Sequence, residues 1–143
     1  MGILIMKKNL EEVFILDLRY EKSTNKSFEE ALESIKKELK DRKFGVLWEL
    51  NFKDKMAEHN IDFPNNFKIL EVCNPQKANE VLSKHLDVGY FLPCKMVVYE
   101  NKGKVFIGTA RPEILIGMME YDDLGDVASE VERILIEAID AAI

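Results

Sequence analysis

The chain has 143 residues, of which 47% are hydrophobic and 32% are charged, with a net charge of −6. This length fits one domain with its own core, so we predict a single domain over residues 1–143, and the composition excludes a disordered or fibrous chain. The negative charge would repel a phosphate backbone, which excludes nucleic acid as the expected partner.

The apolar start of the chain, GILIM, is too short to be a membrane span, and Lys7 and Lys8 follow it rather than precede it. It therefore lacks the flanks of a secretory signal. The chain has two cysteines, Cys73 and Cys94, and without an export signal we expect both thiols to be reduced. We predict a cytoplasmic protein that does not contact a membrane.

The first predicted element is a strand over residues 13–21, VFILDLRYE. Its apolar and polar residues alternate as in a half-buried strand, with one set on each face. The inward set is Phe14, Leu16, Leu18 and Tyr20, and the outward set includes Asp17 and Arg19.

A helix is predicted to follow, from a capping box at Ser27-Phe28-Glu29-Glu30 to about Lys43. Its apolar stripe consists of Phe28, Ala31, Leu32, Ile35 and Leu39.

The segment GVLWELN, residues 45–51, predicts the second strand, with Val46, Trp48 and Leu50 inward and Glu49 outward. Residues 51–66 are a long connection with apolar residues at Phe52, Met56 and Phe63. We interpret this connection as a short amphipathic helix or lid over the sheet, or as a surface connection that its apolar side chains hold in place.

The segment FKILEVCNPQKA, residues 67–78, predicts a strand that ends at Cys73 and passes directly into a helix. Asn74 is a suitable N-cap, and Pro75 fits the first helical position. The helix is expected to end before Gly89, with Ala78, Val81, Leu82, His85 and Leu86 on its inner stripe. Free amides at a helix start would stabilise a Cys73 thiolate, whereas a buried Cys73 would be an ordinary small apolar residue.

Residues 92–110 predict a hairpin whose strands CKMVVYE and KVFIGTA are joined by a turn at Asn101-Lys102-Gly103. Cys94 opens the first strand. If the preceding helix crosses back along the sheet, the two thiols begin at opposite ends of it, although residues 87–93 are long enough to undo that separation. We expect neither a disulfide nor a shared metal site, because the chain offers few further soft ligands.

The last part of the chain predicts a short helix beginning at Pro112 and a long C-terminal helix. The apolar residues between 114 and 119 are expected in the core, in a ligand cavity or in a subunit contact. Glu120, Asp122 and Asp123 lack the spacing of a calcium loop. The long helix carries Val127, Val131, Ile134, Leu135, Ala138 and Ala142 at helical spacing, with Ser129, Glu130 and Arg133 in water.

The predicted order is β-α-β-β-α-β-β-α, an α+β chain. The segments FKILEVCNPQKANEVL and DVGYFLPCKMVVYENKGKVFIGTARPEIL resemble the bacterial and archaeal family called domain of unknown function 302. The resemblance extends from about Ser27 to the C-terminus and includes IDFPNNFKIL and the strand of Glu49.

The resemblance implies a TATA-binding-protein-like fold, with a curved, mainly antiparallel sheet packed on one face by helices, and usually a homodimer. It implies no established chemistry, and the fold alone does not imply DNA binding. The chain departs from the family pattern at Lys95 and at Arg111-Pro112.

Three hypotheses remain for the function. The first is a homodimeric module that binds a small polar ligand on the concave sheet face, below the 51–66 segment, through Cys73, Asn74, Glu49, Cys94 and Lys95, with Glu71 an alternative to Cys73. The second is a structural or interaction protein without an active site. The third is a thiol-dependent enzyme or redox sensor with Cys73 as the thiolate. We predict no cofactor and no metal, and assign no catalytic residue.

Overall fold

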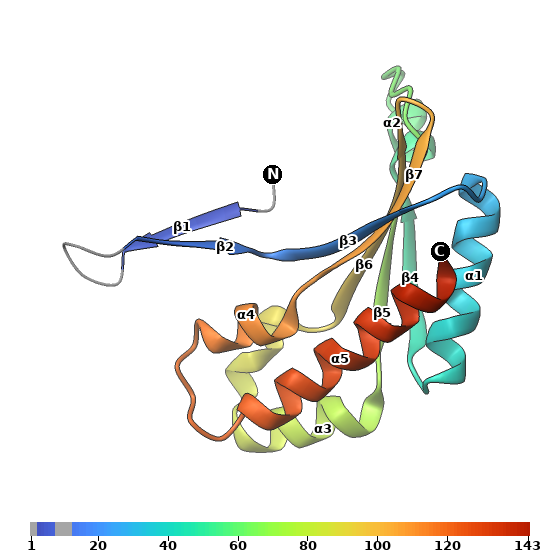
Figure 1. Cartoon of the computed structure of the whole chain (residues 1–143). Helices are drawn as coiled ribbons and strands as arrows, with labels where there is room; N and C mark the ends of the chain where they lie inside the picture. Colours follow the sequence, from blue (N-terminus) through green and yellow to red (C-terminus); the bar gives the residue numbers. More distant parts are fainter. Residues whose placement is uncertain (1–2, 8–12) are drawn as a thin grey trace.

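The structure is a computed structural model that describes residues 3–7 and 13–143 (Figure 1). Its main sheet has five antiparallel strands in the order β3-β7-β6-β5-β4. These strands are β3 (Arg19–Thr24), β4 (Gly45–Asn51), β5 (Phe67–Cys73), β6 (Cys94–Asn101) and β7 (Lys104–Ala110). The predicted α+β class, with a curved antiparallel sheet, is confirmed.

Helices cover one face of this sheet and leave the other face open (Figure 1). The helices of the described chain are α1 (Phe28–Asp41), α2 (Phe52–Glu58), α3 (Pro75–Lys84), the 3₁₀ helix η1 (Leu86–Phe91), α4 (Pro112–Gly117) and α5 (Gly125–Ala142), and α2 lies at one end of the sheet rather than on the covered face. The core lies between the sheet and helices α1 and α5, where Leu70, Met96 and Ile107 are fully buried. None of the helices in the described part of the chain has the length and apolar content needed to span a membrane.

Helix α1 forms as its sequence predicts. The Ser27 hydroxyl accepts a hydrogen bond from the Glu30 amide, and the Glu30 carboxylate accepts one from the Ser27 amide. The whole predicted stripe is buried, from Phe28 to Leu39. In α5 the predicted stripe is also buried, except that Ile134 is half-buried.

The predicted strand over residues 13–21 is two strands that separate at Leu18. Strand β2 (Val13–Asp17) pairs with β1 (Ile3–Lys7) in a separate two-stranded sheet, and β1 was not predicted. At this break the Asp17 carboxylate accepts a hydrogen bond from the Arg19 amide at 3.0 Å, and β3 continues nearly in line with β2 (Figure 1). The expected inward positions of Phe14 and Leu16 lie outside the residues whose side chains are described.

Strand β4 differs from its predicted pattern because its register with β5 shifts between Val46 and Trp48. The extra residue, Leu47, is a β-bulge that reverses the side-chain alternation after it. Trp48 is therefore 53% exposed rather than inward. Glu49 instead faces the helices, because it pairs with the buried Leu70.

The transition from β5 to α3 is the predicted one. Cys73 ends the strand, the Asn74 side chain accepts a hydrogen bond from the Lys77 amide at 3.1 Å, and Pro75 is the first helical residue. The helix ends earlier than expected, at Lys84, so Leu86 is 82% exposed rather than on an inner stripe.

The hairpin of β6 and β7 is also confirmed, with positive φ angles of 52° at Lys102 and 78° at Gly103. Of the two arrangements that the sequence left open for the thiols, the structure has the one in which the connection before β6 brings them together. Cys94 pairs with Val72, the residue before Cys73. Because β5 and β6 are antiparallel, the end of one strand lies beside the start of the next, and both cysteines lie at the same end of the sheet.

Candidate functional site

A cavity of about 260 Å³ lies at the end of the sheet where β5 ends and β6 begins, beside η1 and α4. Strand residues form its floor, and η1, the segment after it, and α4 form its walls. Its charged lining residues are Glu71 and Lys95, and its apolar residues include Phe91, Leu92, Pro93, Leu115 and Ile116. The cavity forms because the connection between α3 and β6, which contains η1, passes beside this end of the sheet.

Glu71 and Lys95 are direct neighbours across β5 and β6. Lys95 Nζ donates a hydrogen bond to Glu71 Oε1 at 3.0 Å. The Glu71 side chain is 18% exposed and that of Lys95 is 47% exposed, so the acid is held in place while the amine reaches solvent. The cavity thus presents one anion and one cation side by side.

Cys94 also lines this cavity, directly before Lys95. Burial, together with the nearby Cys73 and Glu71, raises the pKa of the Cys94 thiol to about 12. Burial also raises the pKa of the Cys73 thiol above its ordinary value. Both thiols are therefore protonated near neutral pH, which counts against Cys73 as a thiolate nucleophile. The α3 amide that the Asn74 side chain engages, Lys77 N, is not free for a thiolate.

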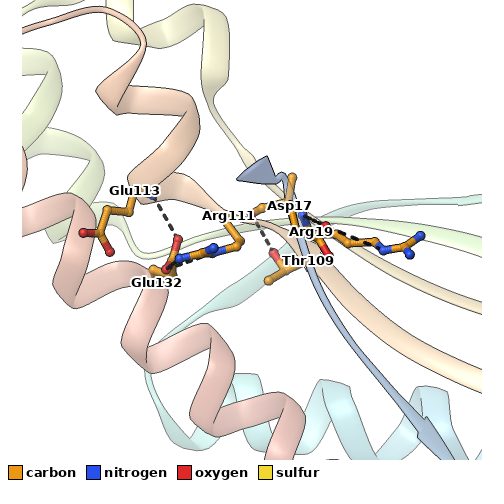
Figure 2. A network of polar contacts seen from close by, with 7 residues as sticks. Asp17, Arg19, Thr109, Arg111, Glu113 and Glu132 are labelled. Carbon is orange, nitrogen blue, oxygen red and sulfur yellow. Dashed lines mark hydrogen bonds and ion pairs between the residues drawn. The ribbon is translucent and has the colours of Figure 1, made fainter. Parts of the chain in front are cut away.

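A buried carboxylate on α5 holds the α4 wall in place (Figure 2). The Arg111 guanidinium donates two hydrogen bonds to Glu132 Oε2, at 3.2 and 3.0 Å. Glu132 Oε1 accepts a third from the amide of Glu113, in the first turn of α4. The Arg111 charge is therefore neutralised by Glu132, whose side chain is buried.

Cys73 and Asn74 lie beside the cavity rather than in it. They line a separate apolar space of about 30 Å³, together with Cys94, Leu92 and Pro93. This space has room for about one water at most, and its lining is apolar, so it is a packing defect rather than a ligand site. Cys94 lines both spaces, as do Leu92, Pro93, Pro112 and Ile116.

Glu49 is not part of the cavity, although it was grouped with Lys95 in the sequence-based site. Its carboxylate lies on the helix-covered face, where Oε1 is 2.8 Å from Lys36 Nζ and 3.0 Å from Lys68 Nζ. The bulge at Leu47 causes this difference, because it reverses the face on which Glu49 lies.

The 51–66 segment forms α2, as one of the two interpretations allowed, but it does not cover the cavity. The rings of Phe52 and Phe63 contact Phe67, with centroids 5.5 and 6.4 Å away. Phe67 begins β5 whereas Glu71 is near its end, about 13 Å further along the strand. The segment is held at the opposite end of the sheet by these aromatic contacts.

The sequence interpretation placed too little weight on Glu71 and did not identify Glu132. Glu71 could have been found from the strand pattern, because it lies between Leu70 and Val72, which are both buried. Glu132 stands on the stripe of Ala128, Leu135 and Ile139, where a charged residue is unusual. Within the described residues, no group of three or more His, Cys, Asp or Glu side chains could hold a metal.

The family model described as "Domain of unknown function DUF302" matches residues 20–142. The chain belongs to the DUF302 family. A solved structure described as an uncharacterized conserved DUF302 protein from Bacillus stearothermophilus is 40% identical to this chain, with a TM-score of 0.85. The match covers 88% of this chain and 98% of that one. No functionally curated protein matches the chain.

Proposed function

We propose that this DUF302 protein is a homodimeric module that binds a small polar ligand in the cavity above Glu71 and Lys95. The observation that carries the proposal is the Lys95–Glu71 ion pair, at 3.0 Å, in a cavity with otherwise mostly apolar walls. Ligand sites generally combine an apolar lining with a few convergent polar groups that fix orientation.

The size and energetics of the cavity fit a small ligand. Its volume of about 260 Å³ is slightly below the roughly 300–1,000 Å³ of sites for drug-sized molecules, which favours a smaller metabolite. The Lys95 side chain is 47% exposed, and an exposed ion pair stabilises a protein by only about 0–1 kcal/mol. A ligand can therefore displace this pair at little cost in stability.

The homodimer is supported by large apolar side chains on the surface. Leu47 is 61% exposed and Trp48 is 53% exposed, both on the edge strand β4. Tyr90, which also lines the cavity, is 89% exposed. Aromatic residues are enriched where subunits meet, and an edge strand is a ready surface for a second chain. Two unbonded thiols favour a cytoplasmic location.

The interaction protein without a site is the second candidate, because the exposed residues of β4 would serve it equally well. The thiol-dependent enzyme is the least supported, since the pKa of both thiols is raised. A ligand test therefore separates the first candidate from the second.

The ligand test is a thermal-shift screen with a broad panel of metabolites, followed by titration with Trp48 fluorescence as the readout. Trp48 is the only tryptophan in the chain and pairs with Glu71, so it reports on the cavity floor. Ala110→Phe fills the floor, since Ala110 lines the cavity. We expect that metabolites which raise the unfolding temperature of the wild type no longer do so in this variant. They should still do so in Ala57→Phe, which changes an exposed residue of α2. A panel that shifts nothing in the wild type contradicts the proposal.

The homodimer is tested separately by sedimentation. Leu47→Asp places a charge on the exposed β4 bulge, and Ile61→Asp places one on an exposed residue after α2. We expect the first variant to dissociate at concentrations where the second remains a dimer. A wild-type protein that sediments as a monomer would remove the dimer from the proposal and leave the ligand site unaffected.

A further inference from the structure

We propose that the ligand of this cavity is a zwitterion, specifically an α-amino acid with an apolar side chain. This inference rests on the proposed function and specifies its chemistry. The amine of the ligand would pair with Glu71 and its carboxylate with Lys95, whose charged atoms are 3.0 Å apart. Because the amine and carboxylate of an α-amino acid share one carbon atom, two adjacent protein charges of opposite sign can contact both.

The electrostatics of the cavity favour a ligand without net charge. Glu71 and Lys95 are its only charged lining residues among those described. The thiol of Cys94 is neutral, because its pKa is raised to about 12. Behind the α4 wall, Arg111 is neutralised by Glu132 at 3.0 Å. A ligand with a single charge would therefore meet one attractive group and one repulsive group of equal size.

A zwitterion replaces one ion pair by two. Without ligand, Lys95 and Glu71 satisfy each other at the boundary with solvent. With an amino acid bound, each would contact an opposite charge of the ligand, and the four charges would alternate in sign. A neutral amide can form hydrogen bonds at the same positions but gains no charge pairing, so it is expected to bind more weakly.

The remaining walls are suited to an apolar side chain. Leu92 and Pro93, from the segment after η1, and Leu115 and Ile116, from α4, line the cavity. Ile116 is only 7% exposed and so forms a fixed wall. Burying an apolar side chain here stabilises the complex in proportion to the area removed from water, which favours leucine or a similar amino acid over glycine.

The test compares four ligands that share one side chain and carry different charges. Leucine is the zwitterion, leucinamide the cation, N-acetylleucine the anion and N-acetylleucinamide the neutral form. Affinity is measured at pH 7 by Trp48 fluorescence and by calorimetry on the full chain. We expect leucine to bind at least about 10-fold more tightly than each of the other three, as expected for one lost charge-assisted contact.

Two variants test which charge of the ligand each of the two protein side chains contacts. In Glu71→Gln, leucine is expected to lose its advantage over N-acetylleucine, because the amine no longer meets an anion. In Lys95→Gln, leucine is expected to lose its advantage over leucinamide, because the carboxylate no longer meets a cation. Asp41→Asn is the control, since it breaks the exposed Lys37–Asp41 pair on α1, outside the cavity.

The outcomes distinguish the two proposals. The zwitterion assignment is overturned if leucine does not bind, or binds no more tightly than leucinamide or N-acetylleucine. In that case, other metabolites that bind the wild type and not Ala110→Phe would leave the proposed function intact. If no compound of either set binds, both proposals are contradicted.

Discussion

Arg111 and Glu132 form a largely buried ion pair, with Arg111 Nη2 3.0 Å from Glu132 Oε2. The Glu132 side chain is 6% exposed and that of Arg111 is 33% exposed. The same carboxylate accepts a hydrogen bond from the Glu113 amide, so a single side chain on α5 fixes the first turn of α4. Because α4 is one wall of the cavity, this pair links the core to the proposed site (Figure 2).

Removing one partner of this pair is predicted to destabilise the protein strongly. Arg111→Ala leaves the Glu132 carboxylate buried without a cation, and we expect a loss of about 3–5 kcal/mol in the free energy of unfolding. The measurement is urea unfolding, compared with Arg133→Ala, which breaks an exposed pair with Glu137 and should cost less than about 1 kcal/mol.

Replacing both partners by apolar residues is predicted to cost less than removing one. In Arg111→Met with Glu132→Leu, no buried charge is left unpaired, so most of the loss should be recovered. Equal unfolding free energies for the single and the double variants would show that the pair itself, rather than the unpaired charge, determines stability.

The two thiols are predicted to react slowly with iodoacetamide. A raised pKa lowers the thiolate fraction at any given pH, so the rate for Cys73 should increase only above the pH at which a free thiol reacts. Cys94, with a pKa of about 12, should react still more slowly. Cys73→Ser and Cys94→Ser isolate each thiol, and a half-maximal rate at or below the pH of a free thiol would contradict this prediction.

The sequence predicts those elements of the fold that depend on local signals. The Ser27 capping box, the Asn74-Pro75 helix start and the turn at Gly103 each involve hydrogen bonds or backbone angles within a few residues. Such signals require no knowledge of distant neighbours, which is why these helix starts and this turn agree with the structure.

The features that the sequence did not predict depend on pairing between distant residues. The bulge at Leu47 arises from the register between β4 and β5, and it moves Glu49 to the opposite face. Cys73 and Cys94 lie at the same end of the sheet because β5 and β6 pair directly. Of the residues grouped as the site, only Cys94 and Lys95 line the cavity, together with Glu71.

Glu49 gives the protein a predicted pH dependence at acidic pH. Hydrogen bonds from Lys36 and Lys68 hold the pKa of Glu49 below its ordinary value of 4.5. Because the unfolded chain binds this proton more readily, the ionised carboxylate stabilises the fold above pH 4.5, and that stabilisation is lost as the pH falls through the lowered pKa. Glu49→Gln should therefore lose up to about 1 kcal/mol at pH 7 and less at pH 3.

The control for this pH dependence is Glu58→Gln, which breaks a pair with Lys55 in which both side chains are more than half exposed. Unfolding is measured in urea from pH 7 to pH 3. Stability curves of Glu49→Gln and wild type that run parallel over this range would show that Glu49 has the same pKa in the folded and unfolded chains.

Two elements that line the cavity are linked by a stacked pair, His85 and Tyr121. Their ring centroids are 3.6 Å apart and the planes differ by 9°. His85 directly precedes η1, and Tyr121 follows α4. Two hydrogen-bonding contacts support the stack: His85 Nε2 lies 2.8 Å from Asp123 Oδ1, and the Tyr121 hydroxyl donates to Asp87 Oδ2 at 2.5 Å.

Removing this stack is predicted to loosen the η1 wall without unfolding the protein. A stacked aromatic pair contributes about 0.5–1.5 kcal/mol beyond its buried area, so Tyr121→Ala should speed amide hydrogen exchange in residues 86–92 by roughly 2- to 10-fold. Tyr121→Phe keeps the ring and loses only the contact with Asp87, and should show a smaller effect. The core amide of Leu70 serves as an internal reference, because the side chain of Leu70 is fully buried in the sheet. Unchanged exchange at η1 in Tyr121→Ala, or equal acceleration at Leu70, would show that this stack does not hold the wall.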